Sequence, residues 1–201
     1  MTKFLDKAYQ ARDADSTRAL YDDWAASYEA EVAENGYATP GRCAKTLKTY
    51  ARDLGAPVLD FGCGTGLSGL ALKLAGFETI DGVDLSAEML TEARGKGVYR
   101  HLDQIEAGGT LPRKDYALCA AIGVIGAGAA PISVLHTLMR ALPRDGKLVF
   151  SFNDHALEDR SNEAGVCEWT DCGAARLLFK EHGPHLPGIG LKSTVYVLEK
   201  A

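Results

Sequence analysis

A glycine-rich turn at residues 60–66 carries the residue types whose spacing points most directly to chemistry. Gly62, Gly64 and Gly66 alternate with other residues there, and Asp60 stands two positions ahead of the first glycine. Glycine permits a backbone with positive φ and lets a ligand come close to the main chain. When a helix follows such a turn, its free N–H groups face the ligand. The pattern therefore predicts a site for a nucleotide-like cofactor.

The glycine spacing separates this turn from other phosphate-binding and dinucleotide-binding loops. The dinucleotide fingerprint G-x-G-x-x-G needs a glycine three positions after its second glycine. Counted from Gly64, that position holds Leu67. The sequence also contains no G-x-x-x-x-G-K-[ST] run, so it carries no P-loop signature.

A second acidic residue, Asp84, ends the next apolar run of the chain. A carboxylate at this place can accept hydrogen bonds from both hydroxyls of a ribose. Leu85 and Met89 follow it, and we expect them to pack against an adenine ring. Ser86 is placed to cap a helix, with Glu88 in the first turn, where the helix dipole favours an acid.

Strand patterns alternate with helical stripes through the middle of the chain, and this predicts a parallel sheet with helices on both faces. The expected strands are residues 57–61, 79–83, 99–105, 116–122 and 147–152.

The end of the chain breaks this alternation. Residues 176–180 and 193–198 both have strand patterns, and the link 181–192 holds prolines and glycines without a helical period. We therefore expect a C-terminal hairpin whose last strand runs antiparallel. Residues 154–175 have no clear pattern.

Taken together, residues 58–66 and 82–90 resemble a class I S-adenosylmethionine (SAM)-dependent methyltransferase. The resemblance implies an α/β, Rossmann-like fold with a mostly parallel seven-stranded sheet in the order 3-2-1-4-5-7-6, strand 7 being antiparallel. It also implies SAM as cofactor, S-adenosylhomocysteine as product, and a generic methyltransferase activity (EC 2.1.1.-).

A narrower resemblance lies ahead of the glycine turn. Residues 20–28 are similar to the methyltransferase-like 27 (Williams-Beuren region) group and its bacterial relatives. In such proteins the N-terminal segment folds over the bound cofactor, which implies that Tyr21, Trp24 and Tyr28 help to cover SAM. An aromatic stripe at helical spacing is also typical of a core-facing helix, so both interpretations stay open here.

The residue that meets the adenine amino group is expected at the end of the third strand, where Asp103, Gln104 and Glu106 compete. Asp103 or Gln104 is the predicted one. The full set of expected cofactor-binding residues is Tyr21, Trp24, Tyr28, Asp60, Gly62, Cys63, Gly64, Gly66, Leu67, Asp84, Leu85, Met89, Asp103, Gln104 and Ile122.

Composition limits the other classes of function. The chain has 201 residues and a net charge of −5 without a lysine or arginine run, so a nucleic-acid partner is not expected. It shows no membrane-spanning run or signal peptide, and its five cysteines fit reduced thiols in the cytoplasm. We expect one methyltransferase domain, made of an N-terminal helical cap (1–54), a cofactor-binding core (55–153), and a substrate-side segment with the terminal hairpin (154–201).

This length leaves no room for a separate recognition domain, so a small-molecule acceptor at oxygen or nitrogen is the predicted substrate. The alternatives are a protein or RNA methyltransferase, a SAM-binding protein without transferase activity, and a nicotinamide oxidoreductase. No catalytic residue or metal site is assigned from the sequence. His155, just after the fifth strand, is the candidate general base. A monomer or a homodimer is expected.

Overall fold

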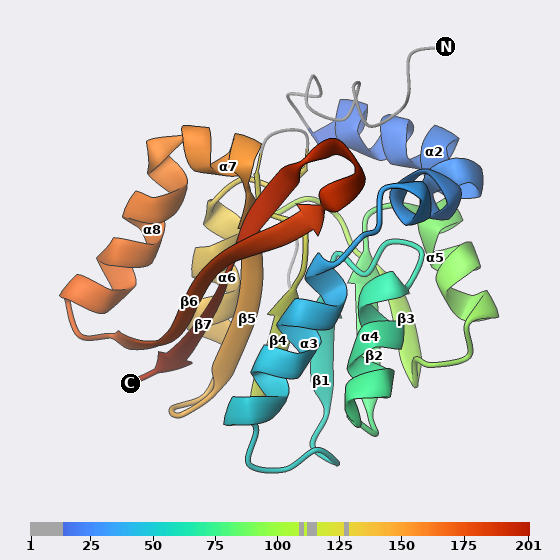
Figure 1. Ribbon diagram of the computed structural model, residues 1–201. Coiled ribbons are helices and arrows are strands. Elements are labelled where there is room, and N and C mark those ends of the chain that lie inside the picture. The colour runs from blue at the N-terminus through green and yellow to red at the C-terminus, as the bar shows by residue number, and fades with distance from the viewer. Residues whose placement is uncertain (1–13, 109–110, 112–115, 127–128) are drawn as a thin grey trace.

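The computed structural model describes residues 14–108, 111, 116–126 and 129–201. Its strands form one seven-stranded sheet in the order β3-β2-β1-β4-β5-β7-β6 (Figure 1). β7 is antiparallel to β5 and β6, and the other neighbouring strands are parallel. The strands are β1 (Val58–Phe61), β2 (Ile80–Asp84), β3 (His101–Gln104), β4 (Leu118–Ala121), β5 (Lys147–Asn153), β6 (Ala175–Leu186) and β7 (Leu191–Lys200). The predicted fold class and sheet order are confirmed.

Helices cover both faces of the sheet and its carboxyl edge. They are α2 (Ala14–Glu34), α3 (Thr39–Tyr50), α4 (Leu67–Ala75), α5 (Ala87–Gly95), α6 (Ser133–Ala141), α7 (Asp154–Glu158) and α8 (Arg160–Asp171), with the short 3-10 helix η1 (Pro187–Ile189). α3 and α4 pack on one face, whereas α6 and α8 pack on the other. α2 lies across the carboxyl end of the sheet, at the top of Figure 1.

β5 shows how the strands join the two layers. Leu148, Phe150 and Phe152 point into the core shared with α6 and α8, whereas Val149 points into the core shared with α3 and α4. Successive side chains of a strand point to opposite faces, so a central strand needs apolar residues at nearly every position. This is why the middle strands appear in the sequence as continuous apolar runs.

The C-terminal hairpin forms as expected, but the link predicted at 181–192 is wrong. β6 continues to Leu186, and Pro184 pairs with Lys192 of β7 inside the sheet. β6 is the edge strand, and an edge strand tolerates proline because one side of it needs no hydrogen-bond donor. The connection is therefore only η1 and Gly190, and the hairpin reaches the far end of the sheet beside α2 (Figure 1).

No helix in the part of the chain that the structure describes is long and apolar enough to cross a membrane.

Candidate active site

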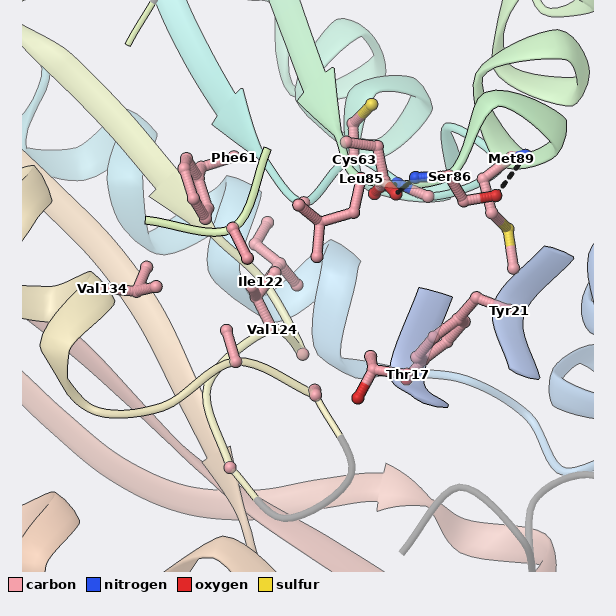
Figure 2. A pocket seen from close by; sticks show the side chains of 18 of the residues that line it. Thr17, Tyr21, Phe61, Cys63, Leu85, Ser86, Met89, Ile122, Val124 and Val134 are labelled. Carbon is pink, nitrogen blue, oxygen red and sulfur yellow. Dashed lines mark hydrogen bonds between the residues drawn. The ribbon is translucent and has the colours of Figure 1, made fainter. Parts of the chain in front are cut away.

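A cavity of about 750 Å³ opens at the carboxyl ends of β1, β2 and β4 (Figure 2). Its walls include residues 62–65, 84–86 and 122–124, which follow these strands directly. The strand order reverses between β1 and β4, and parallel sheets bind ligands in the crevice at such a reversal. The cavity therefore lies where the topology itself predicts a ligand site.

The glycine turn exposes its backbone to this cavity. Gly62, Gly64 and Gly66 all have positive φ, at 69°, 53° and 93°. A Cβ added at Gly62 would lie 2.6 Å from the side chain of Val124, whereas one added at Gly64 would meet nothing within 4 Å. Gly64 lines the cavity, so the space beside its Cα is open to a ligand.

Asp84 ties the turn to the end of β2. Its Oδ2 accepts a hydrogen bond from the backbone N–H of Gly64 at 2.8 Å, and its Oδ1 accepts one from the N–H of Ser86 at 2.9 Å. Burial raises the pKa of Asp84, and the N–H groups of Ser86 and Gly64 oppose that shift. The N–H of Leu85 also interacts with this carboxylate, and a carboxylate has about four lone-pair sites, so Asp84 can still accept a hydrogen bond from a ligand in the cavity.

Asp60 has a different position from Asp84, although both were predicted to bind cofactor. It is fully buried beneath the turn and is not part of the cavity wall. Its Oδ2 accepts hydrogen bonds from Ser68 Oγ at 2.6 Å and from the Tyr99 hydroxyl at 2.7 Å. Burial raises the pKa of Asp60 to about 6. Asp60 therefore supports the turn from behind.

The other turn residues divide in the same way. Leu67 and the backbone of Cys63 line the cavity, but the Cys63 side chain points toward β2, where its sulfur would lie 3.0 Å from a Cβ on Gly82. Gly66 lies outside the wall and caps α4. Ile122, at the end of β4, lines the cavity as expected.

Leu85, Ser86 and Met89 form the wall beyond Asp84 (Figure 2). Ser86 caps α5 by accepting a hydrogen bond from the N–H of Met89 at 3.0 Å. The cap fixes the first turn of α5, so that Met89 lies on the cavity side. The two apolar side chains predicted to face an adenine ring therefore lie together with Asp84.

Neither Asp103 nor Gln104 lies in the wall, and Ile105 and Glu106 lie there instead. Gln104 donates from Nε2 to the carbonyl of Leu85 at 2.9 Å. The wall residues are those just past a strand end, and β3 ends at Gln104. The sequence pattern located the third strand but not its last residue. Asp103 and Gln104 were therefore predicted at a wall position that Glu106, two or three residues later, occupies.

α2 covers the same end of the cavity. Tyr21 and Tyr28 line the cavity, whereas Trp24 between them is only 2 % exposed. Trp24 stacks on Tyr21 at a centroid distance of 5.7 Å and contacts Tyr28 edge-on at 4.8 Å. The stripe thus serves both purposes left open by the sequence, because one face packs in the core and the other faces the cavity.

Two ion pairs hold α2 in this place. Arg18 Nη2 lies 2.6 Å from Glu106 Oε2, and both residues line the cavity. Lys96, just after α5, pairs with Glu29 in the middle of α2. These pairs connect α2 to the segments that follow β3 and α5.

The opposite end of the cavity, here called the α6 end, is built from Val124 and from residues at the starts of α6 and α8. Ile132, Val134 and Thr137 come from the α6 segment, and Ser161 and Asn162 come from α8. Its wall mixes apolar side chains with hydroxyl and amide groups. The end around residues 62–67 and 84–89 is called the glycine-turn end.

His155, the candidate base, lies on α7 and is not among the residues that line the cavity. Its side chain is 41 % exposed, with Nδ1 at 3.7 Å from Glu158 Oε1. Sequence reasoning also missed Thr17, Arg18 and Tyr37, which line the cavity from the N-terminal segment. No motif marks them, because each is a single side chain brought there by the packing of α2 and α3.

The chain belongs to the methyltransferase-domain family, whose model matches residues 35–188. The geometry of the cavity agrees with this membership. Among curated proteins it is similar to human methyltransferase-like protein 27, with 33 % identity over an aligned length of 166 residues, and the match covers 74 % of this chain and 67 % of that protein. The predicted resemblance to SAM-dependent methyltransferases and to the methyltransferase-like 27 group is thereby confirmed.

Solved structures share the fold at low sequence identity. A SAM-dependent methyltransferase from Mesorhizobium loti matches with a TM-score of 0.58 and 14 % identity, covering 77 % of this chain and 96 % of that one. The cyclase SpnF matches with a TM-score of 0.56 and 18 % identity, covering 80 % of each chain. These likenesses concern the fold, which hosts more than one named reaction.

Proposed function

We propose that this protein transfers a methyl group from SAM to an oxygen or nitrogen atom of a small-molecule acceptor. The observation that carries the proposal is the single cavity that joins the glycine-turn end to the α6 end. Its volume of about 750 Å³ lies in the upper part of the range of small-molecule sites, roughly 300–1,000 Å³. One cavity of this size has room for a nucleoside cofactor together with a small acceptor.

The residues at the glycine-turn end fit SAM. Asp84 keeps acceptor capacity for the ribose hydroxyls besides the backbone N–H groups that it already binds. Leu85 and Met89 offer apolar surface for the adenine ring. The open space at Gly64 admits the amino-acid part of the cofactor next to the backbone, where the Thr65 hydroxyl is buried without a hydrogen-bond partner among the described residues.

SAM, once bound, supplies an electrophilic methyl group on its sulfonium sulfur, and the protein supplies binding and alignment. The chain orients the acceptor through the walls of the α6 end and excludes water by laying α2 over the site. Correct alignment alone can lower the barrier by roughly 7–11 kcal/mol at best. A general base is therefore not required by the proposal, and His155 has no part in it.

A small acceptor is favoured over a protein or RNA because α2, anchored by the buried side chains of Trp24 and Val32, covers the glycine-turn end. The net charge of −5 also disfavours RNA. A monomer or a homodimer is the proposed oligomeric state. The second candidate function is SAM binding without methyl transfer. The observation that favours it is the fold likeness to a cyclase.

The test uses purified protein, SAM labelled in its methyl group, and a metabolite extract. We expect the label in the small-molecule fraction together with S-adenosylhomocysteine, and little of either with Asp84→Asn. Label found only in protein or RNA would overturn the small-molecule acceptor. Tight SAM binding by calorimetry with no product from any fraction would favour the second candidate, and binding of NAD with SAM inert would overturn both.

A further inference from the structure

A second, smaller cavity of about 60 Å³ adjoins the large one beneath α2. Six residues line both cavities and form the shared wall: Tyr21, Tyr28, Tyr37, Gly123, Gly126 and Ala129. The small cavity has room for a few waters, or for one compact polar group. It is too small for a whole substrate, but it extends the large cavity by one functional group.

His185, near the end of β6, forms part of the wall of the small cavity. The hairpin brings it there, because the N–H of Ala38 donates to the carbonyl of His185 at 2.9 Å and that of Gly188 donates to Asn35 at 3.0 Å. The His185 ring is 6 % exposed, and the Tyr37 ring meets it edge-on at 5.2 Å. A histidine from the C-terminal hairpin thus lies beside the N-terminal helices.

One ring nitrogen of His185 is engaged and the other is not. Nδ1 lies 2.8 Å from the hydroxyl of Thr39. Within the described residues, Nε2 has no hydrogen-bond partner, although the residue is nine-tenths buried. Nε2 does not belong to the fully buried polar atoms that lack a partner, so it reaches accessible space, and the small cavity that His185 lines is where a water or a ligand can bind it.

The direction of a hydrogen-bond chain decides what Nε2 offers. Arg42 Nη1 donates to Ser193 Oγ at 3.2 Å, and Ser193 Oγ lies 2.8 Å from Thr39 Oγ1. A guanidinium only donates, which leaves Thr39 as the acceptor for the Ser193 proton and Nδ1 of His185 as the acceptor for the Thr39 proton. This is the direction that gives each hydroxyl proton an acceptor among these groups. Nδ1 then has no proton, and Nε2 carries one.

The ring is also neutral near pH 7. Burial lowers the pKa of His185 to about 4, with Asp154 opposing the shift and Arg42 and His155 adding to it. A neutral ring with its proton on Nε2 is a hydrogen-bond donor toward the cavity. It is neither a cation nor a proton-accepting base on that side.

We propose that the small cavity is a recognition subsite for the methyl acceptor, in which His185 Nε2–H donates to a carbonyl or carboxylate oxygen of that molecule. The inference rests on the proposed function for the existence of the acceptor. It adds that the acceptor carries such an oxygen besides the atom that is methylated. His185 is thus a specificity-determining residue, since an analogue that lacks the oxygen leaves Nε2–H unpaired.

The first measurement is the tautomer of His185 in protein labelled with ¹⁵N-histidine, read from a long-range ¹H–¹⁵N correlation spectrum and assigned with His185→Phe. We expect the proton on Nε2. Thr39→Val removes the donor to Nδ1 and should move the proton, wholly or partly, to Nδ1, whereas Thr39→Ser should keep it on Nε2. A wild-type ring with its proton on Nδ1 would overturn the proposal.

The second measurement titrates the same protein with acetate, acetamide and methylammonium. Acetate and acetamide carry an accepting oxygen and should shift the Nε2 resonance of His185, whereas methylammonium has no lone pair and should not. The absence of a shift with both oxygen probes, or a shift with methylammonium only, would overturn the subsite.

A third measurement separates this inference from the proposed function. Calorimetry should give the same SAM affinity, within about twofold, for wild type, His185→Phe and His185→Gln. With a labelled acceptor from the extract, His185→Phe should raise KM by about three- to tenfold, the loss expected for one neutral hydrogen bond. His185→Gln keeps an N–H donor and should recover part of it. Failure of SAM to bind wild type would refute the proposed function, while the spectra still decide the role of His185.

Discussion

The glycine-turn end and the α6 end of the large cavity are assembled in different ways. The glycine-turn end consists of two short stretches, residues 62–67 and 84–89, which are joined by the hydrogen bond from the Gly64 N–H to the Asp84 carboxylate. The α6 end collects side chains from the segment after β4 and from α6 and α8. The residues of the glycine-turn end can be recognised from sequence motifs. Those of the α6 end come together only in the folded protein.

This difference follows from what each end has to bind. The glycine-turn end presents backbone and one carboxylate, and the geometry of a turn is set by residues that are neighbours in sequence. The α6 end presents side chains, and any segment that reaches the edge of the sheet can supply them. We therefore expect substitutions at the glycine-turn end to lower SAM affinity strongly, and substitutions away from it to leave SAM affinity unchanged.

The largest effect is expected from Gly64→Ala. The added methyl group enters the open space beside the turn, and we expect SAM affinity to fall by about a hundredfold, or nearly 3 kcal/mol, measured by calorimetry. Gly97→Ala is the matched control, since Gly97 has φ of 63° and its added Cβ also meets nothing within 4 Å.

Both alanines should lower the unfolding free energy by a similar amount, about 1 kcal/mol, because both take a left-handed backbone. Only Gly64→Ala should affect SAM. Equal SAM affinity in the two variants would remove the open space at Gly64 from the cofactor site.

The second effect in size is expected from Asp84→Asn. The amide keeps the shape of the side chain but loses the charge that strengthens hydrogen bonds from N–H and O–H donors. We expect SAM affinity to fall by about thirtyfold, since a hydrogen bond to a charged group contributes roughly 1.5–3 kcal/mol. Asp103→Asn, outside the cavity wall, is the control and should bind SAM as wild type does. The reverse ranking would restore Asp103 as the cofactor contact.

The sequence could predict the alternation of strands and helices, the glycine turn and Asp84, because apolar periodicity and glycine spacing are local signals. The sheet order came from the family resemblance that these motifs carry. It could not place Glu106, because a register error of two residues lies within the uncertainty of a weak strand end. It gave no sign of His185, whose role depends on β6 continuing past Pro184 until the hairpin reaches α3. What was missed is long-range packing, which leaves no periodic pattern.

Asp60 sharpens the comparison, because it belongs to the glycine-turn end without lining it. Burial raises the pKa of Asp60 to about 6 from 3.8. A carboxyl group whose pKa is raised in the folded state binds its proton more readily in the native protein than in the unfolded chain. Ionised Asp60 therefore lowers the free energy of unfolding above about pH 6, and this destabilisation is relieved as pH falls toward 4. Between pH 7.5 and 5, wild type should gain roughly 1.4 kcal/mol of unfolding free energy relative to Asp60→Asn.

Urea unfolding at the two pH values, in wild type and variant, measures that difference and cancels the other titrating groups. No change in the difference with pH would mean that Asp60 is ionised in the native protein with no penalty. The supporting role assigned to it beneath the turn would then need another explanation.

The smallest effect is expected at the link between α2 and the segment after β3. Arg18→Ala breaks the pair with Glu106, and exposed pairs of this kind contribute little. We expect SAM affinity to fall by no more than about threefold at low salt, with the difference shrinking at high salt as the charges are screened.

Lys180→Ala, which breaks the exposed pair with Glu163 between β6 and α8, is the matched control and should leave SAM affinity unchanged. A loss of more than tenfold in Arg18→Ala that persists at high salt would contradict a covering role. It would mean that Arg18 contacts the cofactor itself, so that a residue without any motif contributes as strongly as the turn. The glycine-turn end would then depend on a side chain brought there by folding, and the distinction between the two ends of the cavity would fail.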